Sequence, residues 1–434
     1  MNDRQRNPRL DRLIDAAPRD GARIALVSTW DVENNAVRIL AATLRAQGHH
    51  TVEIYFKDWI SNHLDPASAE ELDALTRVLR REQVNLVTIS IRASAYAEQA
   101  RVITEHVQRE LDLPVLWGGM HPTLRGDDCI DYADMTLAGE GELALADLAN
   151  RLVQKDDEVF GTQNVWFRME RDLERGSSSR GPSPVPHATH VRRNSLRPLV
   201  TNLDDLEFRD YTTHAHKYFI QGGSYVVGDP MRGDPVFQMM GSRGCIYKCS
   251  YCYNSTYKKD VYPGQKWFRV RSPQSMVDEI RAARAHWPMK RIRFDDEVFN
   301  FQLGWLEEFC EIYPREVGLP FEIFIEPKLV NEERMTMLRD AGLSNVYMGI
   351  QSSERVTGHL YDRRVKNTSI EDIAQLYHRL GIKPHFQLIF DDPVSTEADK
   401  QSLFEMIASF PHPFDLYLFS MTVFPGSELN KKLI

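Results

Sequence analysis

The stretch GSRGCIYKCSYCYNS (241–255) places Cys245, Cys249 and Cys252 on one short loop. It directly follows the apolar stretch PVFQMMG (235–241), which predicts a buried strand. Three thiolates on a tight loop can converge on a four-iron, four-sulfur cluster, because each soft sulfur binds one iron. The fourth iron then has no cysteine, and this open position can bind a small molecule through nitrogen and oxygen atoms.

Zinc, or a cluster that only carries electrons, fits this loop less well. A structural zinc site normally has a fourth Cys or His at short spacing, and the loop contains neither. An electron-carrying cluster is more often bound by four cysteines. We therefore expect Cys245, Cys249 and Cys252 to bind a [4Fe–4S] cluster with one open iron.

The other two cysteines lie apart from the loop, and five cysteines are too few for a disulfide framework in a chain of this length. Cys310 shares one helical face with Leu306, Phe309 and Tyr313, which predicts a packed side chain. Cys129 is expected to be partly exposed. A catalytic role stays open for both of these cysteines.

From Pro235 onward, strand-like and helix-like patterns alternate along the chain. Six apolar stretches are separated by five helical patterns, and six consecutive βα units predict a parallel barrel or partial barrel. Capping residues predict helix starts at Ser272, Asn331 and Ser369. The expected strands are 235–241, 291–297, 321–327, 344–350, 384–390 and 414–421.

The first 150 residues show a second alternation of strands and helices. Continuous apolar strands with helices between them predict a doubly wound parallel sheet, Rossmann-like or flavodoxin-like, covered on both faces. The ligands of such α/β sheets lie beyond the C-terminal ends of the strands. The expected strands are 22–28, 51–56, 84–91, 114–117 and 134–138.

The length of 434 residues predicts two or three domains of about 150 residues each. We expect a polar N-terminal arm at 1–20, the sheet domain at 21–154, a linker and connecting segment at 155–234, and the barrel domain at 235–434. Within the connecting segment, residues 171–190 are rich in Ser, Pro, Gly and Arg, which predicts a flexible linker or loop.

The composition excludes several classes of protein. The 62 acidic residues outnumber the 53 basic ones and no long basic run occurs, so non-specific nucleic-acid binding is not expected. No stretch reaches about 18 uninterrupted apolar residues, so no membrane span is expected. The N-terminus is too polar for a secretory signal. We therefore expect a cytoplasmic protein.

The cysteine loop resembles the signature of radical S-adenosylmethionine (radical SAM) enzymes, Cx3CxΦC, with Tyr251 as the aromatic residue. GSRGC (241–245) is similar to the sequence common in the cobalamin-binding branch of that family. The resemblance implies a partial (β/α)6 TIM-like barrel that binds a [4Fe–4S] cluster and SAM. It extends over most of the chain through FDDEVFN (294–300), MGIQSSERV (348–356), FPGSEL (424–429) and RVRSPQSMVDEI (269–280).

The same resemblance implies a set of SAM-binding residues at the strand ends of the barrel. The backbone near Tyr251 to Tyr253 would meet the adenine. Asp295 and Asp296 would lie near the methionine or substrate end, and Gln351 with Ser352 would lie near the ribose. FDDPVSTE (390–397) lacks the glycine-containing turn that the branch often has there, so no adenine contact is carried over to that segment.

The first domain has no dinucleotide-binding turn, because VSTWDVENNA (27–36) contains no glycine. Two glycine loops do follow its later strands, WGGMHPTLRGDD (117–128) and LAGEGELAL (137–145). They resemble the loops of cobalamin-binding domains that line the pocket for the nucleotide tail of the corrin. The residues implied as cobalamin contacts are Gly118, Gly119, His121, Gly139, Glu140 and Gly141.

The D-x-H-x-x-G motif that supplies a histidine to cobalt is missing, so no histidine is expected on the lower face of the cobalt. Two of the implied contacts also have a purely structural interpretation. His121 could stabilise its own turn, and Glu140 could be an acidic residue favoured at a helix N-terminus.

The resemblance implies a cobalamin-dependent radical SAM enzyme. A 5′-deoxyadenosyl radical would abstract a substrate hydrogen, and methylcobalamin would deliver a methyl group to the unactivated carbon. Two alternatives stay open: a non-methylating cyclisation or rearrangement, and a non-catalytic cobalamin and iron–sulfur binding protein. A methylthiotransferase is disfavoured, because its N-terminal domain should carry three more cysteines and this one has only Cys129.

The expected partners are an unknown substrate, either a small molecule or a peptide, and an external one-electron reductant, with no nucleic acid and no membrane. Methyltransferases of this branch commonly continue into a C-terminal segment that helps to close the substrate pocket, whereas this sequence stops at Ile434. Closure by a large substrate, by a partner or by residues missing from this sequence stays open.

Overall fold

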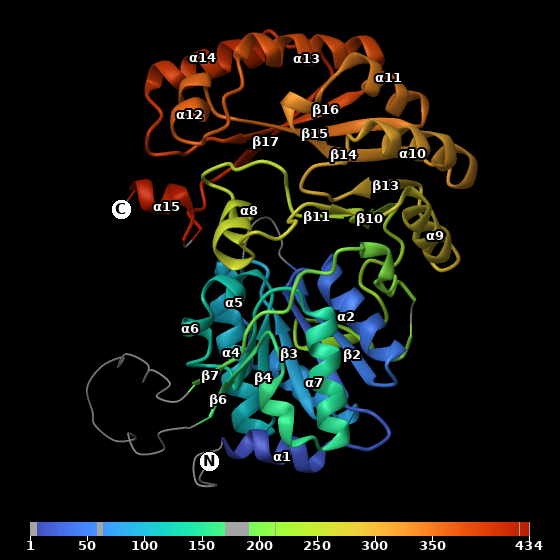
Figure 1. Ribbon diagram of the computed structural model, residues 1–434, viewed down its shortest axis with the longest axis vertical. Coiled ribbons are helices and arrows are strands. Elements are labelled where there is room, and N and C mark those ends of the chain that lie inside the picture. Colours follow the sequence, from blue (N-terminus) through green and yellow to red (C-terminus); the bar gives the residue numbers. More distant parts are fainter. Residues whose placement is uncertain (1–6, 59–63, 170–190, 213, 425, 434) are drawn as a thin grey trace. The chain divides into compact units, whose positions relative to one another are not determined.

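The computed structural model describes residues 7–58, 64–169, 191–212, 214–424 and 426–433 of the chain. The chain forms two compact units, which Figure 1 colours along the sequence. Among the described residues, no helix combines the length and the apolar character that crossing a membrane requires. The first unit consists of Met1–Pro198 and Glu207–Arg232, and the second consists of Leu199–Leu206 and Gly233–Ile434.

A nine-stranded sheet forms the centre of the first unit, in the order β7-β6-β5-β4-β3-β1-β2-β8-β9. Six neighbouring strands pair in parallel: β5, β4, β3, β1, β2 and β8. At one edge β6 and β7 add antiparallel pairs, and at the other edge β9 adds one. From β1 the chain adds β2 on one side, whereas β3, β4 and β5 are added in turn on the other side. The direction in which strands are added therefore reverses between β1 and β3. The strands are β1 Arg23–Trp30, β2 His50–Asp58, β3 Leu86–Ser90, β4 Val115–Gly118, β5 Met135–Leu137, β6 Val165–Arg168, β7 Val191–Arg193, β8 Lys217–Gln221 and β9 Ser224–Val227.

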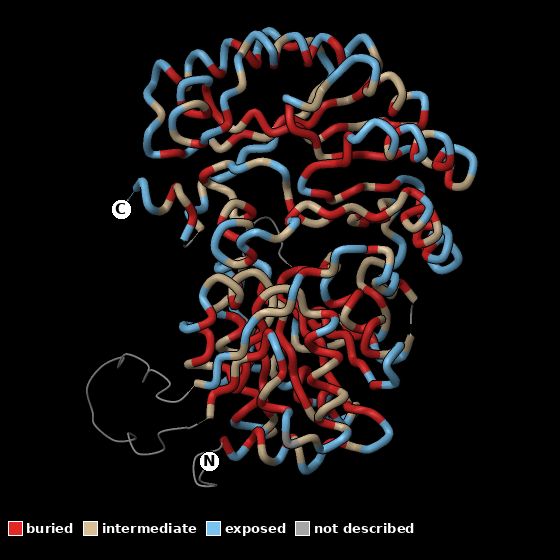
Figure 2. Tube along the Cα trace, viewed as in Figure 1, coloured by how far each residue is buried: buried red, intermediate tan, exposed pale blue. Residues whose placement is uncertain are grey.

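Helices cover both faces of this sheet, as the doubly wound prediction requires (Figure 1). Side chains of β1 alternate between two buried cores: Ile24 and Leu26 pack with α1, α2 and α7, whereas Ala25 and Val27 pack with α3 and α4. Figure 2 shows these buried strands in red. The helices are α1 Pro8–Ala16, α2 Asn35–Ala46, α3 Ala69–Arg81, α4 Ala97–Glu110, α5 Met120–Leu124, α6 Gly126–Cys129 and α7 Glu142–Gln154.

Two expected boundaries of the first domain differ from the structure. The N-terminal arm expected at 1–20 contains helix α1, whose Leu10 and Leu13 are buried in the core with α7. Pro8 at the start of the helix and the Asn7 cap favour this helix locally.

The connecting segment expected at 155–234 is not separate from the folded units. Its described parts contribute β6, β7, β8 and β9 to the first sheet, and residues 199–206 belong to the second unit. The flexible stretch expected at 171–190 lies outside the described residues. Short edge strands escape sequence analysis because three to five residues carry too little hydrophobic pattern.

The second unit contains six parallel strands in chain order, β10-β13-β14-β15-β16-β17 (Figure 1). Helices between successive strands complete the βα units, and the order ends at β10 and β17, so the described barrel is partial. A small ribbon pairs β11 (Ser242–Arg243) with β12 (Arg269–Val270). The six strands are β10 Val236–Met239, β13 Arg291–Phe294, β14 Phe321–Ile325, β15 Leu343–Gln351, β16 Lys383–Ile389 and β17 Asp415–Phe419.

Two of the three predicted helix starts in this unit are confirmed. Ser272 caps α9 through the backbone N–H of Ser275, and Asn331 caps α11. The start expected at Ser369 is wrong, because α13 already begins at Asn367. The helices are α8 Tyr253–Thr256, α9 Pro273–Arg284, α10 Leu303–Glu316, α11 Glu332–Asp340, α12 Glu354–His359, α13 Asn367–Leu380, α14 Glu397–Ala408 and α15 Glu428–Leu433.

Candidate functional site

The three-cysteine loop runs from β11 to α8, just beyond the C-terminal end of β10. Hydrogen bonds from distant parts of the unit hold its backbone. The N–H of Ser250 donates to the carbonyl of Tyr361 (3.0 Å), and the carbonyl of Ser250 accepts from the N–H of Leu429 (2.9 Å). Within the loop, the hydroxyl of Ser255 donates to the carbonyl of Cys249 (2.7 Å). The loop is therefore fixed before any cofactor binds.

The three sulfurs are half-buried, and each takes part in a hydrogen bond, that of Cys249 with the side chain of Tyr251. The backbone N–H of Tyr247 donates to Cys245 Sγ (3.5 Å), and the side-chain amide of Asn254 donates to Cys252 Sγ (3.7 Å). Burial raises the pKa of Cys245 to about 11 and that of Cys252 to about 12, and it also raises the pKa of Cys249. The thiolate forms therefore need a nearby cation, such as an iron ion bound to the sulfurs.

Tyr251 and Tyr253 flank the third cysteine and point to different partners. The Tyr251 ring packs edge-on against Tyr361, with 4.9 Å between the ring centroids. The Tyr253 hydroxyl donates a hydrogen bond to the carboxylate of Glu297. Burial raises the pKa of Tyr253 well above its usual value, so its proton stays available for that bond. Glu297 is a further residue at this site that sequence analysis did not select, although it follows the two aspartates directly in FDDEVFN.

Asp295 and Asp296 have different surroundings. Asp296 is buried and accepts hydrogen bonds from the backbone N–H of Gly241 (3.3 Å) and from the hydroxyl of Ser242. It therefore holds the chain that leads into the cysteine loop. Asp295 directly follows β13 and forms an ion pair with Arg293 of that strand (2.6 Å).

Gln351 and Ser352 lie together at the C-terminal end of β15. Gln351 has a φ of +75°, and the pairing of β15 with β16 shifts between Gly349 and Gln351. A left-handed conformation at a residue other than glycine is strained and is often found at ligand sites. The Ser352 hydroxyl lies 3.4 Å from a carboxylate oxygen of Asp392 and 3.3 Å from the hydroxyl of Ser395.

Glu326 and Arg363 form a buried ion pair that sequence analysis missed. Arg363 Nε donates to Glu326 Oε2 (2.9 Å), and both side chains are less than 10% exposed. Arg363 Nη1 and Glu326 Oε1 are buried and have no hydrogen-bond partner in the structure. Electrostatic interactions connect Arg363 with Cys249 and Tyr251. One unpaired donor and one unpaired acceptor beside the cysteines match the carboxylate and the ammonium of an amino acid, and SAM carries both groups.

The glycine loops of the first unit line a cavity of about 90 Å³. The cavity lies at the carboxyl ends of β1, β3, β4 and β5, where the connections of the sheet reverse and where ligands of such sheets bind. Its walls are mostly apolar, with Leu26, Leu40 and Leu137 among the lining residues. Four of the six implied cobalamin contacts line it: Gly118, Gly119, Gly139 and Gly141.

The conformation at two of these positions requires glycine. Gly119 has a φ of +105°, and a Cβ there would lie 2.8 Å from the carbonyl oxygen of Ile91. Gly139 has a φ of +81°. His121 and Glu140 are not among the described residues that line the cavity. His121 Nδ1 lies within hydrogen-bond distance of the Ser94 hydroxyl (2.9 Å).

The two remaining cysteines are not activated nucleophiles. Cys129 is 1% exposed, so the expectation of partial exposure is wrong; its side chain packs in the core with α3 and α4. Burial raises the pKa of Cys129 to about 12 and that of Cys310 to about 12. A thiol with such a pKa contains almost no thiolate at neutral pH.

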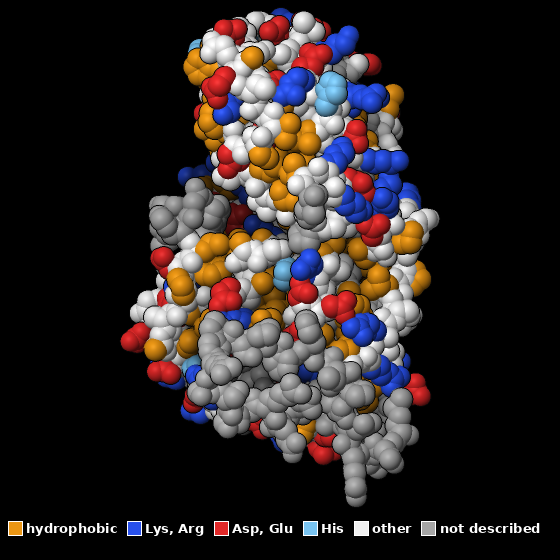
Figure 3. Space-filling model, turned by 90° about the vertical axis from the view of Figure 1, so that its left-hand side faces the viewer, with side chains coloured by type: hydrophobic (Ala, Val, Ile, Leu, Met, Phe, Trp, Pro, Cys, Tyr) orange, Lys and Arg blue, Asp and Glu red, His pale blue; other side chains and the backbone are white. Residues whose placement is uncertain are grey.

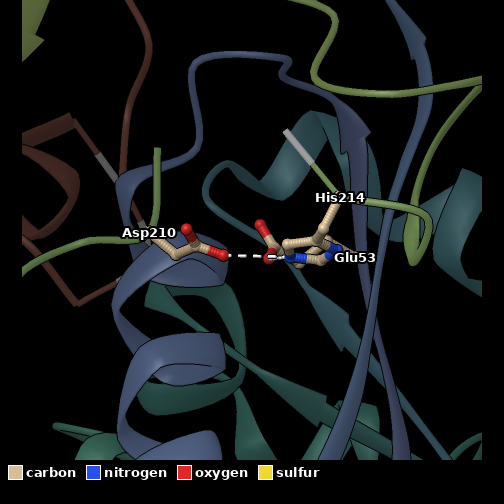
Figure 4. A group of neighbouring side chains, drawn as sticks. All are labelled: Glu53, Asp210 and His214. Carbon is tan, nitrogen blue, oxygen red and sulfur yellow. Dashed lines mark hydrogen bonds and ion pairs between the residues drawn. The ribbon is translucent and has the colours of Figure 1, made fainter. Parts of the chain in front are cut away.

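Glu53, Asp210 and His214 of the first unit form a compact polar cluster (Figure 4). Lys217 is fully buried and lies 3.5 Å from both carboxylates, and Arg45 pairs with both as well. These cations balance the carboxylates, which leaves no net negative charge to attract a metal ion. The cluster instead connects Asp210 and His214 to Glu53 of β2.

The sequence matches two known domain families, one in each unit. Residues 23–149 match the B12 binding domain, and residues 239–407 match the Radical SAM superfamily. A radical SAM domain uses a [4Fe–4S] cluster and SAM, and a B12-binding domain uses cobalamin. These three groups are therefore the cofactors of the chain.

Methyltransferases are among the relatives of the chain. It is 24% identical to cytidylyl-2-hydroxyethylphosphonate methyltransferase of Streptomyces wedmorensis over 389 residues. The aligned residues cover 83% of this chain and 69% of that protein. It is 24% identical to hopanoid C-3 methylase of Methylococcus capsulatus over 324 residues. The aligned residues cover 72% of this chain and 53% of that protein.

The fold is also known from solved structures. The radical SAM methyltransferase TsrM from Kitasatospora setae, with tryptophan substrate and a SAM analog bound, superposes with a TM-score of 0.68 at 16% identity, over 95% of this chain and 76% of that chain. This likeness shows a common fold for the B12-binding and radical SAM units. With both families matched in one sequence, the chain combines a B12-binding domain with a radical SAM domain.

Proposed function

We propose that this protein transfers a methyl group to an unactivated carbon of its substrate. When bound, the cluster with SAM supplies one-electron cleavage chemistry and cobalamin supplies the methyl group. The observation that carries the proposal is the unpaired buried donor and acceptor, Arg363 Nη1 and Glu326 Oε1, next to a loop of three cysteines. Such a pair beside an open iron suits the amino-acid end of SAM.

In the proposed site, Cys245, Cys249 and Cys252 each bind one iron. Arg363 Nη1 donates to the carboxylate of SAM, and Glu326 Oε1 accepts from its ammonium group. Because the two side chains already neutralise each other, they can bind a zwitterion without leaving a net charge in the barrel.

The other predicted SAM contacts keep their roles as proposals. Gln351 and Ser352 would orient the ribose at the end of β15, and Tyr251 with Tyr253 would border the adenine. Asp295 would face the methionine or substrate end. Asp296 would act indirectly, since its carboxylate holds Gly241 and Ser242 at the start of the loop.

For cobalamin, we propose that the cavity between β1 and β3 accepts the nucleotide tail of the corrin. The glycines at 118, 119, 139 and 141 let a flat ligand approach the backbone closely. His121 and Glu140 would contact the ligand from the rim of the cavity.

We further propose a small molecule or a peptide as substrate, and an external one-electron reductant. Three cysteines that must stay reduced to bind iron suit a reducing compartment, which supports the cytoplasm as the location. The residues of the barrel contribute mainly by position, because they hold the reacting groups in place and exclude water.

Anaerobic reconstitution with iron, sulfide and hydroxocobalamin tests the proposal. Methyl transfer predicts S-adenosylhomocysteine together with 5′-deoxyadenosine among the products. 5′-Deoxyadenosine alone would favour the non-methylating cyclisation or rearrangement. Binding of both cofactors without any cleavage of SAM would favour the non-catalytic alternative.

A further inference from the structure

Asn254 donates a side-chain hydrogen bond to a cysteine sulfur of the loop. It lies two residues after Cys252, and its Nδ2 donates to Cys252 Sγ at 3.7 Å. The side chain is 2% exposed, so water does not compete for this bond. Cys245 accepts a bond from the backbone N–H of Tyr247, and Cys249 has a side-chain hydrogen bond with Tyr251.

Trp267 determines which end of the Asn254 amide faces the sulfur. The indole N–H of Trp267 donates to Asn254 Oδ1 at 2.9 Å. An indole nitrogen can only donate, so the oxygen of the amide must point to Trp267. The NH₂ group is thereby turned toward Cys252 and Glu297.

Close packing holds Trp267 itself in place. Its ring stacks on Tyr262, at 6.0 Å between centroids and 20° between planes, and contacts Tyr257 at 5.3 Å. At Gly244, at the start of the cysteine loop, an added Cβ would lie 2.5 Å from the carbonyl oxygen of Trp267. The absence of a side chain at Gly244 therefore lets the loop and the tryptophan touch, and the pair Asn254–Trp267 is rigid.

We propose that Asn254 and Trp267 are positioning residues that set the reduction potential of the cluster. The inference rests on the proposed binding of iron by Cys252. Reduction adds an electron to the cluster and makes its sulfurs more negative. An N–H donor stabilises this reduced form more than the oxidised form, so it raises the potential. With a higher reduction potential, the cluster accepts an electron from the external reductant more readily.

Substitution of either residue, with Ser255→Ala as a matched control, tests this inference. Asn254→Leu removes the donor at similar volume, and Trp267→Phe keeps an aromatic ring but frees the amide to rotate. Ser255 is adjacent to Asn254 and bonds a backbone carbonyl of the same loop, so Ser255→Ala perturbs the loop without touching a sulfur. The readout is the midpoint potential of the cluster in the reconstituted holoenzyme, from a redox titration followed by the EPR signal of the reduced cluster.

We expect Asn254→Leu to lower the ratio of reduced to oxidised cluster about fivefold at a fixed applied potential, as the loss of one hydrogen bond predicts. At about 59 mV per factor of ten for one electron, this is a shift of about 40 mV to lower potential. Trp267→Phe should shift the potential in the same direction by a smaller amount. Ser255→Ala should leave it unchanged.

Wild-type potential in both Asn254→Leu and Trp267→Phe, at full iron content, would overturn the inference. An equal shift in Ser255→Ala would also overturn it, because the effect would then come from loop structure. If Asn254→Leu loses iron, Trp267→Phe decides alone. Failure of the proposed iron ligation would be seen separately, as a wild-type protein that binds no [4Fe–4S] cluster.

Discussion

Arg363 and Glu326 form an ion pair inside the barrel in which each partner keeps one buried atom without a hydrogen bond. A buried ion pair is costly to form, and unpaired buried donors or acceptors add to that cost. Such a pair is therefore expected where a ligand completes it. Its electrostatic interaction with Cys249 and Tyr251 assigns it to the same site as the cysteine loop.

Removal of this pair should weaken the binding of SAM. Arg363→Gln alone would leave Glu326 buried without a partner and destabilise the fold by about 3–5 kcal/mol. The double variant Arg363→Met/Glu326→Gln removes both charges together. We expect its SAM affinity to fall about tenfold to a hundredfold, since hydrogen bonds to charged groups contribute about 1.5–3 kcal/mol. Equilibrium dialysis with labelled SAM under anaerobic conditions measures this loss.

The matched control for that experiment is Arg355→Gln. Arg355 also pairs with a carboxylate in the same unit, that of Asp399, but its side chain is 47% exposed. This variant should keep the wild-type affinity for SAM. An unchanged dissociation constant in the double variant, with iron content intact, would contradict the assignment of Arg363 and Glu326.

Substitution of any loop cysteine by alanine should remove the cluster and leave cobalamin in place. Cys245→Ala, Cys249→Ala and Cys252→Ala should each lose most of the iron and sulfide, because the cluster would have only two cysteine ligands. The cobalamin absorbance should persist, since the proposed corrin contacts lie in the first unit. Cys310→Ala serves as the control and should keep the iron. A full cluster in all three variants would disprove the ligand assignment.

The sequence predicted the features whose chemistry is local. The cysteine spacing within 241–255 predicts a cluster loop by itself, and the glycines after β4 and β5 follow their strands directly. Ser272 and Asn331 are predicted caps that the structure confirms, because capping depends on the next three residues. At α13 the helix extends back to Asn367 without a side-chain cap, so the local signal at Ser369 did not determine the start.

Features that depend on tertiary contacts were not predictable in this way. Arg363 follows α12 outside any motif, and it reaches Glu326 across 37 positions of the sequence. Glu326 did carry a signal, because it ends a predicted strand at the edge where ligands bind. The composition of residues 199–206 does not indicate that they belong to the second unit. Their placement depends on contacts to their backbone, such as the hydrogen bond from Arg269 Nη1 to the carbonyl of Val200 (2.7 Å).

Filling the cavity of the first unit should reduce the binding of cobalamin. Gly118 suits this test, because a Cβ there would make only ordinary contacts, 3.9 Å from Leu137 and 4.0 Å from Leu116. Gly118→Leu should therefore fold but occupy space in a cavity of about 90 Å³. We expect at least about a tenfold loss of cobalamin affinity, which corresponds to about 1.4 kcal/mol. Titration with hydroxocobalamin followed by absorbance measures it.

Gly304→Leu is the control for the cavity experiment. Gly304 lies in α10 of the second unit, and an added Cβ there would have no neighbour within 4 Å. The same increase in side-chain volume should leave cobalamin binding unchanged at this position. Equal cobalamin affinity in Gly118→Leu and the wild type would mean that the corrin tail binds elsewhere.

The cluster of Glu53, Asp210 and His214 predicts a pH-dependent contribution to stability. Burial lowers the pKa of His214, but hydrogen bonds to Asp210 and Glu53 outweigh this and raise it above 6.5. The folded state therefore binds the proton more tightly than the unfolded state, so the stabilisation is complete below pH 6.5 and is lost as the pH rises through the folded pKa. His214→Gln should lower the Tm more at pH 6 than at pH 8.5. Thermal unfolding of the wild type and this variant at the two pH values provides the measurement, and an equal loss of Tm at both would show that the His214 proton adds nothing to the fold.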